Sequence, residues 1–199
     1  MTTPNNYECR EIGELEWEVH WPKVVKSNLM QSWEYGDAKS ISEGWKPVRY
    51  LWEDAIGKPV ALAQVLTKSF SIFGGIARLN RGPLLISYEN FSSDTSVKLE
   101  LISTLRKIAR LKRWWVFFMA PEIQSIDTSE SSLKLNHLNV RQNVCPWAST
   151  RLSLKVDQSG LMATLNGKWR GHLRKAFANK VNVIEVALTS ETIDELISF

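Results

Sequence analysis

Trp114-Trp-Val-Phe-Phe-Met-Ala120 is the stretch of this 199-residue sequence that decides the class of fold. All of its residues are apolar, so it shows no alternation of polar and apolar side chains. A strand with one solvated face alternates, whereas a strand covered on both faces reads as a continuous apolar run. The stretch therefore predicts a buried central strand in a sheet that has helices on both faces.

The segments before this stretch predict the rest of the sheet. Apolar residues recur with helical period from Thr95 to Lys112, which predicts a helix. Upstream, β-rich runs cover Val48–Glu53 and Val60–Ser69, and the turn residues Asp54–Pro59 between them indicate a hairpin. Ile72–Leu79 predicts a further strand, whose paired glycines suit a bulge or a close backbone approach. Hairpins combined with a crossover helix predict an α/β fold with a mixed, mostly antiparallel sheet.

The N-terminal segments predict short helices. Residues from Tyr7 to Val19 predict a strand that leads into a short acidic helix before Pro22. Ser32 is placed to cap a second helix. That helix would carry three residues on or near one side, Trp33, Gly36 and Lys39.

The C-terminal part predicts a strand, a basic helix, a second strand and a last helix, at Thr150–Val156, Gly160–Lys180, Val181–Ala187 and from Thr189 onward. The basic helix has one apolar arc, formed by Leu161, Met162, Leu165, Trp169, His172, Leu173 and Ala176. Asp157 or Ser159 can cap its start, and Asn179 marks its end. Its cations are Lys168, Arg170, Arg174 and Lys175. From this helix alone, a solvated basic face and a ligand-binding face are equally good interpretations.

Composition bounds the function. Apolar residues make up 44% and charged residues 23% of the chain, which is typical of a globular domain. A net charge of +4 suits an anionic small substrate or RNA, and duplex DNA is not indicated. Two distant cysteines and three scattered histidines support neither a disulfide framework nor a zinc site. The longest apolar stretch, Trp114–Ala120, is too short to cross a bilayer, and no signal peptide is seen, so we expect a cytoplasmic protein.

Several common motifs are absent from the sequence. It has no phosphate-binding G-x-x-x-x-G-K-[ST], no dinucleotide-binding G-x-G-x-x-G after a strand, no H-E-x-x-H and no G-x-S-x-G. His172 lies within the apolar arc, where a packing histidine is a better interpretation than a general base. Cys145 has no histidine or acid beside it in sequence. No catalytic residue, metal or resident cofactor is therefore assigned.

Three segments taken together resemble a known family. They are Gln31-Ser-Trp-Glu-Tyr-Gly-Asp-Ala-Lys39 with Gly44-Trp-Lys-Pro47, then Arg78-Leu-Asn-Arg-Gly-Pro-Leu-Leu85, then Pro146-x-x-x-Thr150 leading to Leu165-x-x-Lys-x-Arg-x-x-Leu-Arg-Lys-Ala176 and Val181-x-Val183. Their order and spacing resemble the Fem family of peptidoglycan cross-bridge peptidyltransferases, the lipid II aminoacyltransferases. Two departures are the missing aspartate after Arg81-Gly-Pro83 and the missing glutamine before Pro146.

The resemblance implies a fold and a reaction. Members have two domains of the GNAT acyltransferase fold, so residues 1–180 would form the first, substrate-binding domain. Residues 181–199 would begin a second domain or a returning element, truncated here. Such an enzyme moves an amino acid from aminoacyl-tRNA, its co-substrate, to an amine of a UDP-linked or lipid-linked muramyl peptide. It serves cell-wall biogenesis and cell shape, and a lipid-linked precursor would bring it to the membrane surface. A fragment of this length could lack activity.

The resemblance also implies site residues. Lys39 and Arg170 would hold the phosphates of the precursor, and a lysine facing a bidentate arginine is a sensible clamp for a diphosphate. Lys168 belongs to the same motif. Arg81 either lines the substrate or completes a turn, and Arg174 is equally well interpreted as a solvated side chain or a substrate contact.

Two other functions remain open. An N-acyltransferase that uses acyl-CoA would need a glycine-rich pyrophosphate loop opening a helix, and this chain shows none. A non-catalytic module that binds a nucleotide or tRNA is the third hypothesis.

Overall fold

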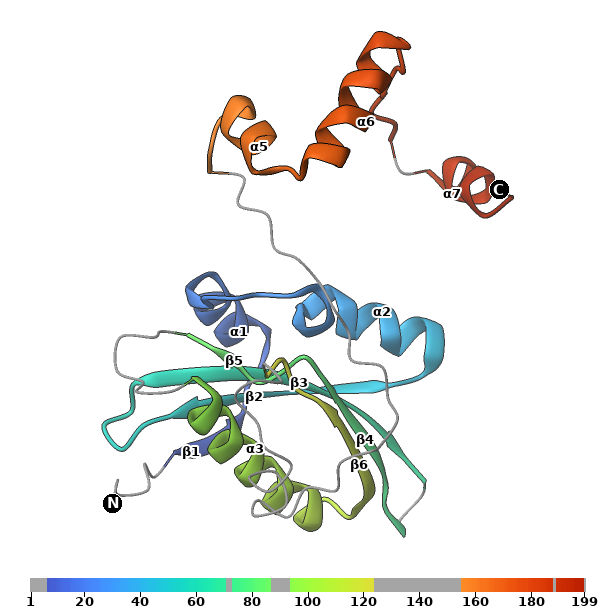
Figure 1. The fold of residues 1–199 in the computed structure, drawn as a ribbon. Coiled ribbons are helices and arrows are strands. Elements are labelled where there is room, and N and C mark those ends of the chain that lie inside the picture. The colour runs from blue at the N-terminus through green and yellow to red at the C-terminus, as the bar shows by residue number, and fades with distance from the viewer. Residues whose placement is uncertain (1–6, 71–72, 87–93, 124–154, 188, 199) are drawn as a thin grey trace. The chain divides into compact units, whose positions relative to one another are not determined.

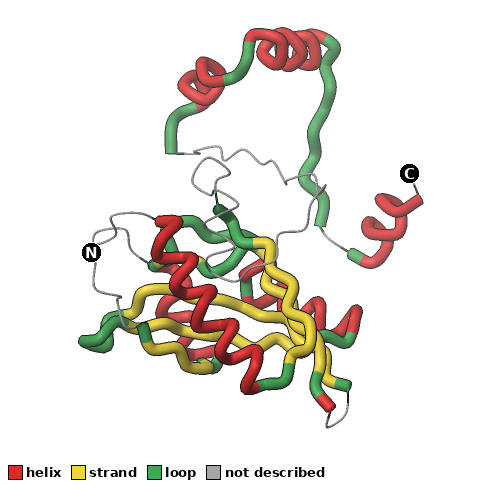
Figure 2. Tube along the Cα trace, turned by 60° about the horizontal axis from the view of Figure 1, so that its bottom comes forward, coloured by secondary structure: helices red, strands yellow, loops and turns green. Residues whose placement is uncertain are grey.

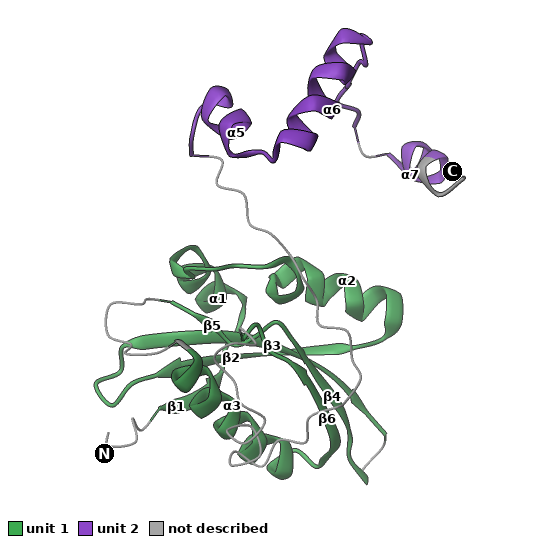
Figure 3. Cartoon of the chain, in the orientation of Figure 1, with its two compact units in different colours: residues 1–142 green, residues 143–199 purple. Residues whose placement is uncertain are grey.

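The computed structural model describes residues 7–70, 73–86, 94–123, 155–187 and 189–198. The chain forms two compact units, residues 1–142 and residues 143–199 (Figure 3), and each is described by itself. The expected division into residues 1–180 and 181–199 stays a prediction, because contacts within the chain do not show where a homologous domain ends.

The first unit is built on one sheet of six strands (Figure 1). Their order across the sheet is β1 (Glu8–Glu11), β2 (Lys46–Glu53), β3 (Pro59–Ser69), β4 (Gly75–Asn80) and β6 (Trp114–Ala120), and β5 (Leu84–Leu85) also pairs with β3. Every pair is antiparallel except β4 with β6, which are parallel. The helix α3 (Asp94–Leu111) connects these two strands, as a parallel pair requires. The expected fold class, α/β with a mixed, mostly antiparallel sheet, is confirmed.

The β2–β3 hairpin follows from its turn residues, as expected. The Asp54 carboxylate accepts hydrogen bonds from the backbone N–H groups of Ile56 at 3.0 Å and Lys58 at 2.9 Å. Gly57 has φ +78°, a conformation that glycine adopts without steric cost. This turn aligns Tyr50 with Ala63 and thereby fixes which residues of both strands share a face.

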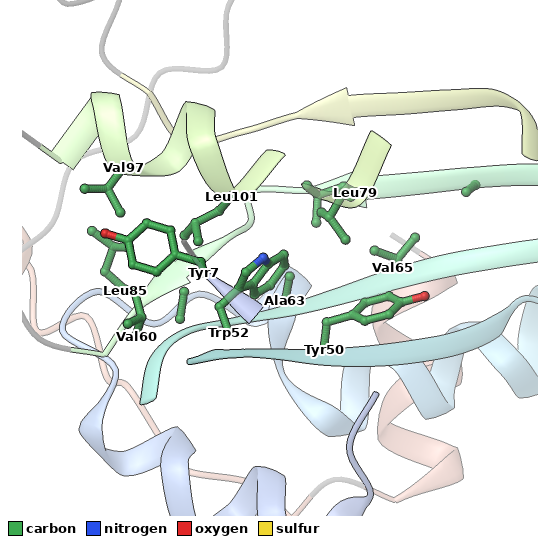
Figure 4. Packing of buried hydrophobic residues seen from close by; sticks show 13 residues of the cluster. Tyr7, Tyr50, Trp52, Val60, Ala63, Val65, Leu79, Leu85, Val97 and Leu101 are labelled. Atoms are coloured by element: carbon green, nitrogen blue, oxygen red, sulfur yellow. The ribbon is translucent and has the colours of Figure 1, made fainter. Parts of the chain in front are cut away.

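The helix α3 covers one face of the sheet (Figure 2). Alternate residues of the strands point to it, among them Tyr50, Trp52, Ala63 and Leu79, and they pack with Val97, Leu101 and Leu105 (Figure 4). Trp52 is fully buried, and its Nε1 donates to the Thr104 hydroxyl at 2.6 Å. This layer is the larger part of the core and anchors the β4–α3–β6 connection.

The other face carries two short helices, α1 (Glu14–His20) and α2 (Trp33–Glu43). Between them lie 3₁₀ turns at Trp21–Lys23 and Leu29–Gln31. Trp17 packs here with Leu51 and Leu62, which alternate with the residues that face α3. The predicted cap is confirmed, because the Ser32 hydroxyl accepts from the N–H of Tyr35 at 3.2 Å. Helices therefore lie on both faces of the sheet, as the sequence indicated.

The position predicted for Trp114–Ala120 is wrong. The segment is a strand, but among the described residues it is an outer strand rather than a central one. Trp114, Phe117 and Met119 pack toward α3, whereas Trp115 and Phe118 on this strand are 60% and 58% exposed. The helices α1 and α2 make their main contacts with β2 and β3. A continuous apolar run thus marks a strand whose second face is exposed among the described residues.

The described residues of the second unit form three helices, α5 (Gln158–Thr164), α6 (Gly167–Ala178) and α7 (Ser190–Ser198). The single helix predicted over Gly160–Lys180 is wrong, because Asn166 leaves the helical conformation and caps α6 by accepting from the N–H of Lys168 at 2.9 Å. The predicted caps at Asp157 and Asn179 are confirmed.

Val181–Ala187 forms no strand, against prediction. A strand needs a partner for its backbone groups, which a sequence pattern cannot supply. Val183, for example, is 89% exposed. Residues 150–154 of the strand expected at Thr150–Val156 lie outside the described residues. In the part of the chain that is described, no helix is long and apolar enough to span a membrane.

Candidate functional site

Lys39 projects from α2, with its ammonium group paired to the Glu43 carboxylate one turn later. The same ammonium group lies 5.7 Å from the centre of the Tyr35 ring. The hydrogen bond to Glu43 raises the pKa of Lys39, and the charge of Arg78 acts in the opposite direction. The charge of Arg78 is the smallest of these influences on the pKa of Lys39. Lys39 and Arg78 place one cation on α2 and one on β4.

Among the residues that the structure describes, the sheet beside α2 has exposed side chains where β4 and β6 meet. Leu66 of β3 pairs with Arg78, and Arg78 pairs with Phe118 of β6, so the three side chains form one row on the face that carries α2. Leu66 is 3% exposed, Arg78 is exposed, and Phe118 is 58% exposed. Exposure on this face therefore begins at β4. We call Arg78, Val116 and Phe118 the open shelf.

Arg81 directly follows β4, at the carboxyl end of the parallel pair. Its backbone has φ +54°, and its N–H donates to the carbonyl of Ala120 at 2.7 Å. The amide of Asn28 donates to the carbonyl of Arg81 at 3.2 Å. The Arg-Gly-Pro motif is thus held as a shaped turn, which supports the turn interpretation of Arg81. Its substrate contact stays a prediction.

Gly82 explains why glycine follows Arg81. A Cβ atom at this position would lie 2.8 Å from Oε1 of Gln31 and 2.8 Å from Cδ1 of Leu79. The buried Gln31 donates to the carbonyls of Gln64 at 3.0 Å and Asn80 at 2.6 Å, and it accepts from the N–H of Gln64 at 2.7 Å. The Gln31 side chain therefore joins the start of α2 to β3 and to the end of β4.

A second buried contact fixes α2 further along. Arg49 of β2 stacks on Trp33 with its guanidinium carbon 3.2 Å from the ring centre, and it donates to Asp37 at 2.9 Å. A Cβ atom on Gly36 would lie 2.1 Å from Oε1 of Gln64, so the helix approaches the sheet as closely as glycine allows. The motif residues around Lys39 thus hold α2 against the sheet.

Sequence reasoning missed the contributions of Arg78 and Gln31 to this site. Both lie within segments that carried the family resemblance, but neither was assigned a role. The signal for Arg78 is alternation along β4, because Leu79 points to the core and Arg78 therefore points to the α2 side. Nothing in the sequence identifies Gln31 as buried, because its partners are backbone groups of two distant strands.

The other predicted site residues lie in the second unit. Lys168, Arg170 and Arg174 all belong to α6. Arg170 is half-buried, whereas Lys168 and Arg174 are exposed. From Gly167 to Lys180 the sequence has no acidic residue, so the helix is strongly cationic. The pairing of Lys39 with Arg170 around one diphosphate stays a prediction.

The described residues offer little nucleophilic or metal-binding chemistry. Burial raises the pKa of the Cys9 thiol to about 12, which leaves it protonated and unreactive near neutral pH. His172 is exposed, and its ring centre is 6.5 Å from that of Trp169, so the expected packed histidine is not seen. No group of three or more metal-binding side chains occurs within the described ranges.

Comparisons with known proteins give matches only among solved structures. No protein-family model matches the sequence, and the search of curated proteins also found no match. Aminoglycoside 6'-N-acetyltransferase AAC(6')-Iy with a CoA bisubstrate analogue matches with a TM-score of 0.46 and 13% identity over 74% of this chain and 99% of that one. The AAC(6')-IG enzyme of Acinetobacter haemolyticus matches with a TM-score of 0.41 and 12% identity over 73% and 99%.

Ribosomal-protein-alanine N-acetyltransferase from Brucella melitensis biovar Abortus 2308 matches with a TM-score of 0.43 and 9% identity over 75% of this chain and 100% of that one. These proteins are N-acetyltransferases, the class to which the expected GNAT-like fold belongs. At such identities and scores the matches say nothing about the substrate of this chain.

Proposed function

We propose that this chain is an acyltransferase domain that binds an anionic acceptor substrate and holds its amine for acyl transfer. The observation that carries the proposal is the presence of two cations, Lys39 on α2 and Arg78 on the neighbouring part of the sheet, with the charge of Arg78 acting on Lys39. An activated ester or thioester needs little further chemistry from the protein. Orientation of the two substrates and removal of one proton from the amine account for most of the rate enhancement.

The finer proposal is transfer of an amino acid from aminoacyl-tRNA to a peptidoglycan precursor. It is supported by the three sequence segments that resemble the Fem family, two of which contribute Lys39 and the Arg81 turn to the first unit. The third segment includes the cationic helix α6, which suits the phosphates of either a precursor or a tRNA. Its Pro146–Thr150 part lies outside the described residues. The implied metal-free, cofactor-free reaction is part of this proposal.

The second candidate is acyl transfer from acyl-CoA. It is the reaction class of the matched N-acetyltransferases, one of which holds a CoA bisubstrate analogue. In this chain α3 is the helix that follows strand β4, and the sequence from Leu84 to Ser93 before it contains no glycine. The backbone amides of a glycine-rich loop would therefore be missing from that helix start. This observation favours the first candidate within residues 1–142.

The experiment is a binding and transfer assay on the 199-residue chain. Binding of UDP-muramyl pentapeptide, acetyl-CoA and tRNA is measured by titration, and transfer is measured with labelled aminoacyl-tRNA or acetyl-CoA as donor. We expect saturable precursor binding that weakens about tenfold or more in Lys39→Ala and Arg170→Ala, since each removes a charge-assisted contact.

Lys58→Ala is the matched control, because Lys58 is an exposed lysine in the β2–β3 turn. Affinity for acetyl-CoA with no precursor binding would replace the first candidate by the second. Affinity for tRNA alone would favour a non-catalytic binding module.

A further inference from the structure

We propose that one end of the first unit docks on an anionic phospholipid bilayer, with Phe70, Phe73, Leu111 and Trp115 in the headgroup region and neighbouring cations on the lipid phosphates. We call these four residues the apolar tip. The inference goes beyond the proposed function and does not rest on it, because such a surface binds lipid headgroups whether or not the acceptor substrate carries a lipid.

Four element ends meet at the apolar tip. Strand β3 and helix α3 end here, and strands β4 and β6 begin here. Two backbone hydrogen bonds join these ends. The N–H of Phe70 donates to the carbonyl of Gly74 at 2.7 Å, and the N–H of Gly75 donates to the carbonyl of Arg113 at 3.1 Å. The turn after β3 and the turn after α3 are thereby held together, so residues from both contribute to one surface.

The backbone fixes the position of Trp115. The register of β4 against β6 shifts after Gly75 and leaves Trp115 as the extra residue of a bulge, a feature that re-aims a side chain. Its ring stacks on Phe70, with the ring centres 6.2 Å apart and the planes at 18°. A Cβ atom on Gly74, which has φ +131°, would lie 2.6 Å from Nε1 of Trp115 and 2.3 Å from the carbonyl oxygen of Arg113. Glycine is therefore needed for the indole to lie against the turn.

The apolar tip exposes large side chains that are normally covered. Phe70, Phe73, Leu111 and Trp115 are 48%, 68%, 83% and 60% exposed. A cluster of this kind indicates an interaction surface, because removing its apolar area from water is favourable. Tryptophan, phenylalanine and leucine are the residues by which proteins that lie on a membrane enter the boundary between headgroups and acyl chains.

The charge around the tip selects an anionic surface. Residues 55–88 and 101–121, the segments that supply the tip, contain no aspartate or glutamate. The second segment carries three exposed cations at intervals of three residues, Lys107, Arg110 and Arg113. Each cation near an anionic bilayer strengthens binding about fivefold at moderate salt. The phosphates of an anionic bilayer therefore complement both the charge and the apolar surface of this end.

Two further lysines of these segments already have partners. Lys112 pairs with Glu11, and Lys68 lies 4.9 Å from the ring centre of Trp45. The attraction to lipid phosphates is therefore argued from the three cations named above and not from these two.

The test measures binding of the 199-residue chain to vesicles by co-sedimentation. Vesicles of phosphatidylcholine are compared with vesicles of an equal mixture of phosphatidylcholine and phosphatidylglycerol. We expect binding to the mixture to be about tenfold tighter or more, and to weaken as salt is added. Phe73→Ser should weaken it about tenfold by removing apolar contact, and Arg110→Gln and Arg113→Gln should each weaken it about fivefold.

Two matched controls separate the apolar tip from general effects. Phe118→Ser removes an exposed phenylalanine of the open shelf, further along β6. Lys58→Gln removes an exposed cation from the turn at the other end of β3. Both variants should bind the mixed vesicles as the unchanged chain does.

Tryptophan fluorescence tests which side chain enters the bilayer. Vesicles with brominated acyl chains should quench the unchanged chain. Trp115→Phe keeps a ring in the stack with Phe70, so it should retain vesicle binding and lose most of the quenching. Trp169→Phe is the control, because Trp169 is a 69% exposed tryptophan on the cationic helix α6 and offers the competing anchor.

Four results would overturn the inference. They are equal binding to neutral and anionic vesicles, undiminished binding in Phe73→Ser, and quenching that survives in Trp115→Phe but is lost in Trp169→Phe. The fourth is self-association of the chain that Phe73→Ser abolishes without any vesicle binding, which would identify a second copy as the occupant of the tip.

The outcome is separable from the proposed function. Phe73→Ser should leave transfer to a soluble UDP-linked precursor unchanged. Transfer without vesicle binding would overturn the inference and leave the acyltransferase proposal standing. Vesicle binding with the expected response to Phe73→Ser, but without transfer from either donor, would support the inference and overturn the proposed reaction.

Discussion

Gln31 and Gln64 are joined in both directions: the Gln31 amide donates to the Gln64 carbonyl at 3.0 Å, and its oxygen accepts from the Gln64 N–H at 2.7 Å. The Gln64 side chain in turn donates to the carbonyl of Ser32 at 2.9 Å. This contact fixes the start of α2 against the middle of β3. Because Lys39 lies on the same helix, the contact also sets where Lys39 lies relative to the sheet.

Removing this contact should destabilise the first unit. Gln31→Leu would leave the N–H of Gln64 and the carbonyls of Gln64 and Asn80 buried without partners, each at a cost of about 1–3 kcal/mol. We expect the free energy of unfolding, measured in urea, to fall by about 3 kcal/mol. Gln158→Leu, at an exposed glutamine of α5, is the control and should change it little. A loss below about 1 kcal/mol for Gln31→Leu would contradict the role given to this side chain.

Gly36 should tolerate no side chain. In Gly36→Ala the Cβ atom would lie 2.1 Å from Oε1 of Gln64 and 2.9 Å from Nη2 of Arg49, so the buried Gln64 and Arg49 side chains or α2 itself must shift. We expect a loss of about 2 kcal/mol in unfolding free energy and weaker binding at Lys39. Gly171→Ala on α6 meets no atom within 4 Å, and its higher helix propensity should make it neutral or stabilising. Equal changes in unfolding free energy for both variants would show that helix propensity alone, and not the contact with the sheet, determines the effect.

Because the Cys9 thiol is buried, we expect the folded chain to lose stability in alkali. Burial raises the pKa of its thiol from an ordinary value of 9.0 to about 12. The stabilisation of the folded chain that this buried thiol provides is complete below pH 9. It is lost as the pH rises, because the unfolded chain then releases the thiol proton that the folded chain retains. Between pH 9 and pH 10 the unfolding free energy should fall by about 1 kcal/mol from this group. Cys9→Ala should lack this decrease, and an identical pH profile for both chains would refute the assignment.

Glu43 should compete with bound anions. Its carboxylate pairs with Lys39, and both groups are exposed enough to exchange partners. Glu43→Gln should therefore strengthen binding of pyrophosphate by about twofold at low salt, and the gain should shrink as salt is added. Titrations at two ionic strengths check this, with Glu191→Gln on α7 as the control. Weaker binding in Glu43→Gln would mean that the carboxylate holds Lys39 in its binding position.

Asn166 should define the start of α6. Its side chain accepts from the N–H of Lys168, and an alanine in its place should cost about 1 kcal/mol of helix stability. NMR chemical shifts of Lys168 and Trp169 should move toward unfolded values in Asn166→Ala, whereas Asn182→Ala, outside the helix, should leave them unchanged. More helical shifts would indicate that α5 and α6 had merged.

Local patterns account for the parts of the structure that the sequence predicted correctly. The hairpin at Asp54–Pro59, the cap at Ser32 and the helix after residue 94 depend on neighbours within a few residues. The sheet class follows from hairpins and one crossover helix, because chain connectivity limits how such elements can pair. The positive charge of residues 167–180 likewise follows from their composition alone.

The predictions that the structure contradicts concern features that depend on groups distant in the sequence. The apolar run at Trp114–Ala120 could not reveal that the second face of β6 is exposed among the described residues, because α1 and α2 make their main contacts with β2 and β3. Val181–Ala187 has strand-forming residues, but strand formation requires a partner. The break at Asn166 follows from a competition between a cap and a continuous helix that periodicity does not resolve.

The sequence by itself therefore determined the class of the sheet and the hairpin and crossover helix of the first unit. Only the tertiary structure decided that Arg78, an unremarkable strand residue, stands in line with Leu66 and Phe118. The physical reason is that pairing between β3, β4 and β6 sets the register across the sheet, and that register is a property of three chain segments together.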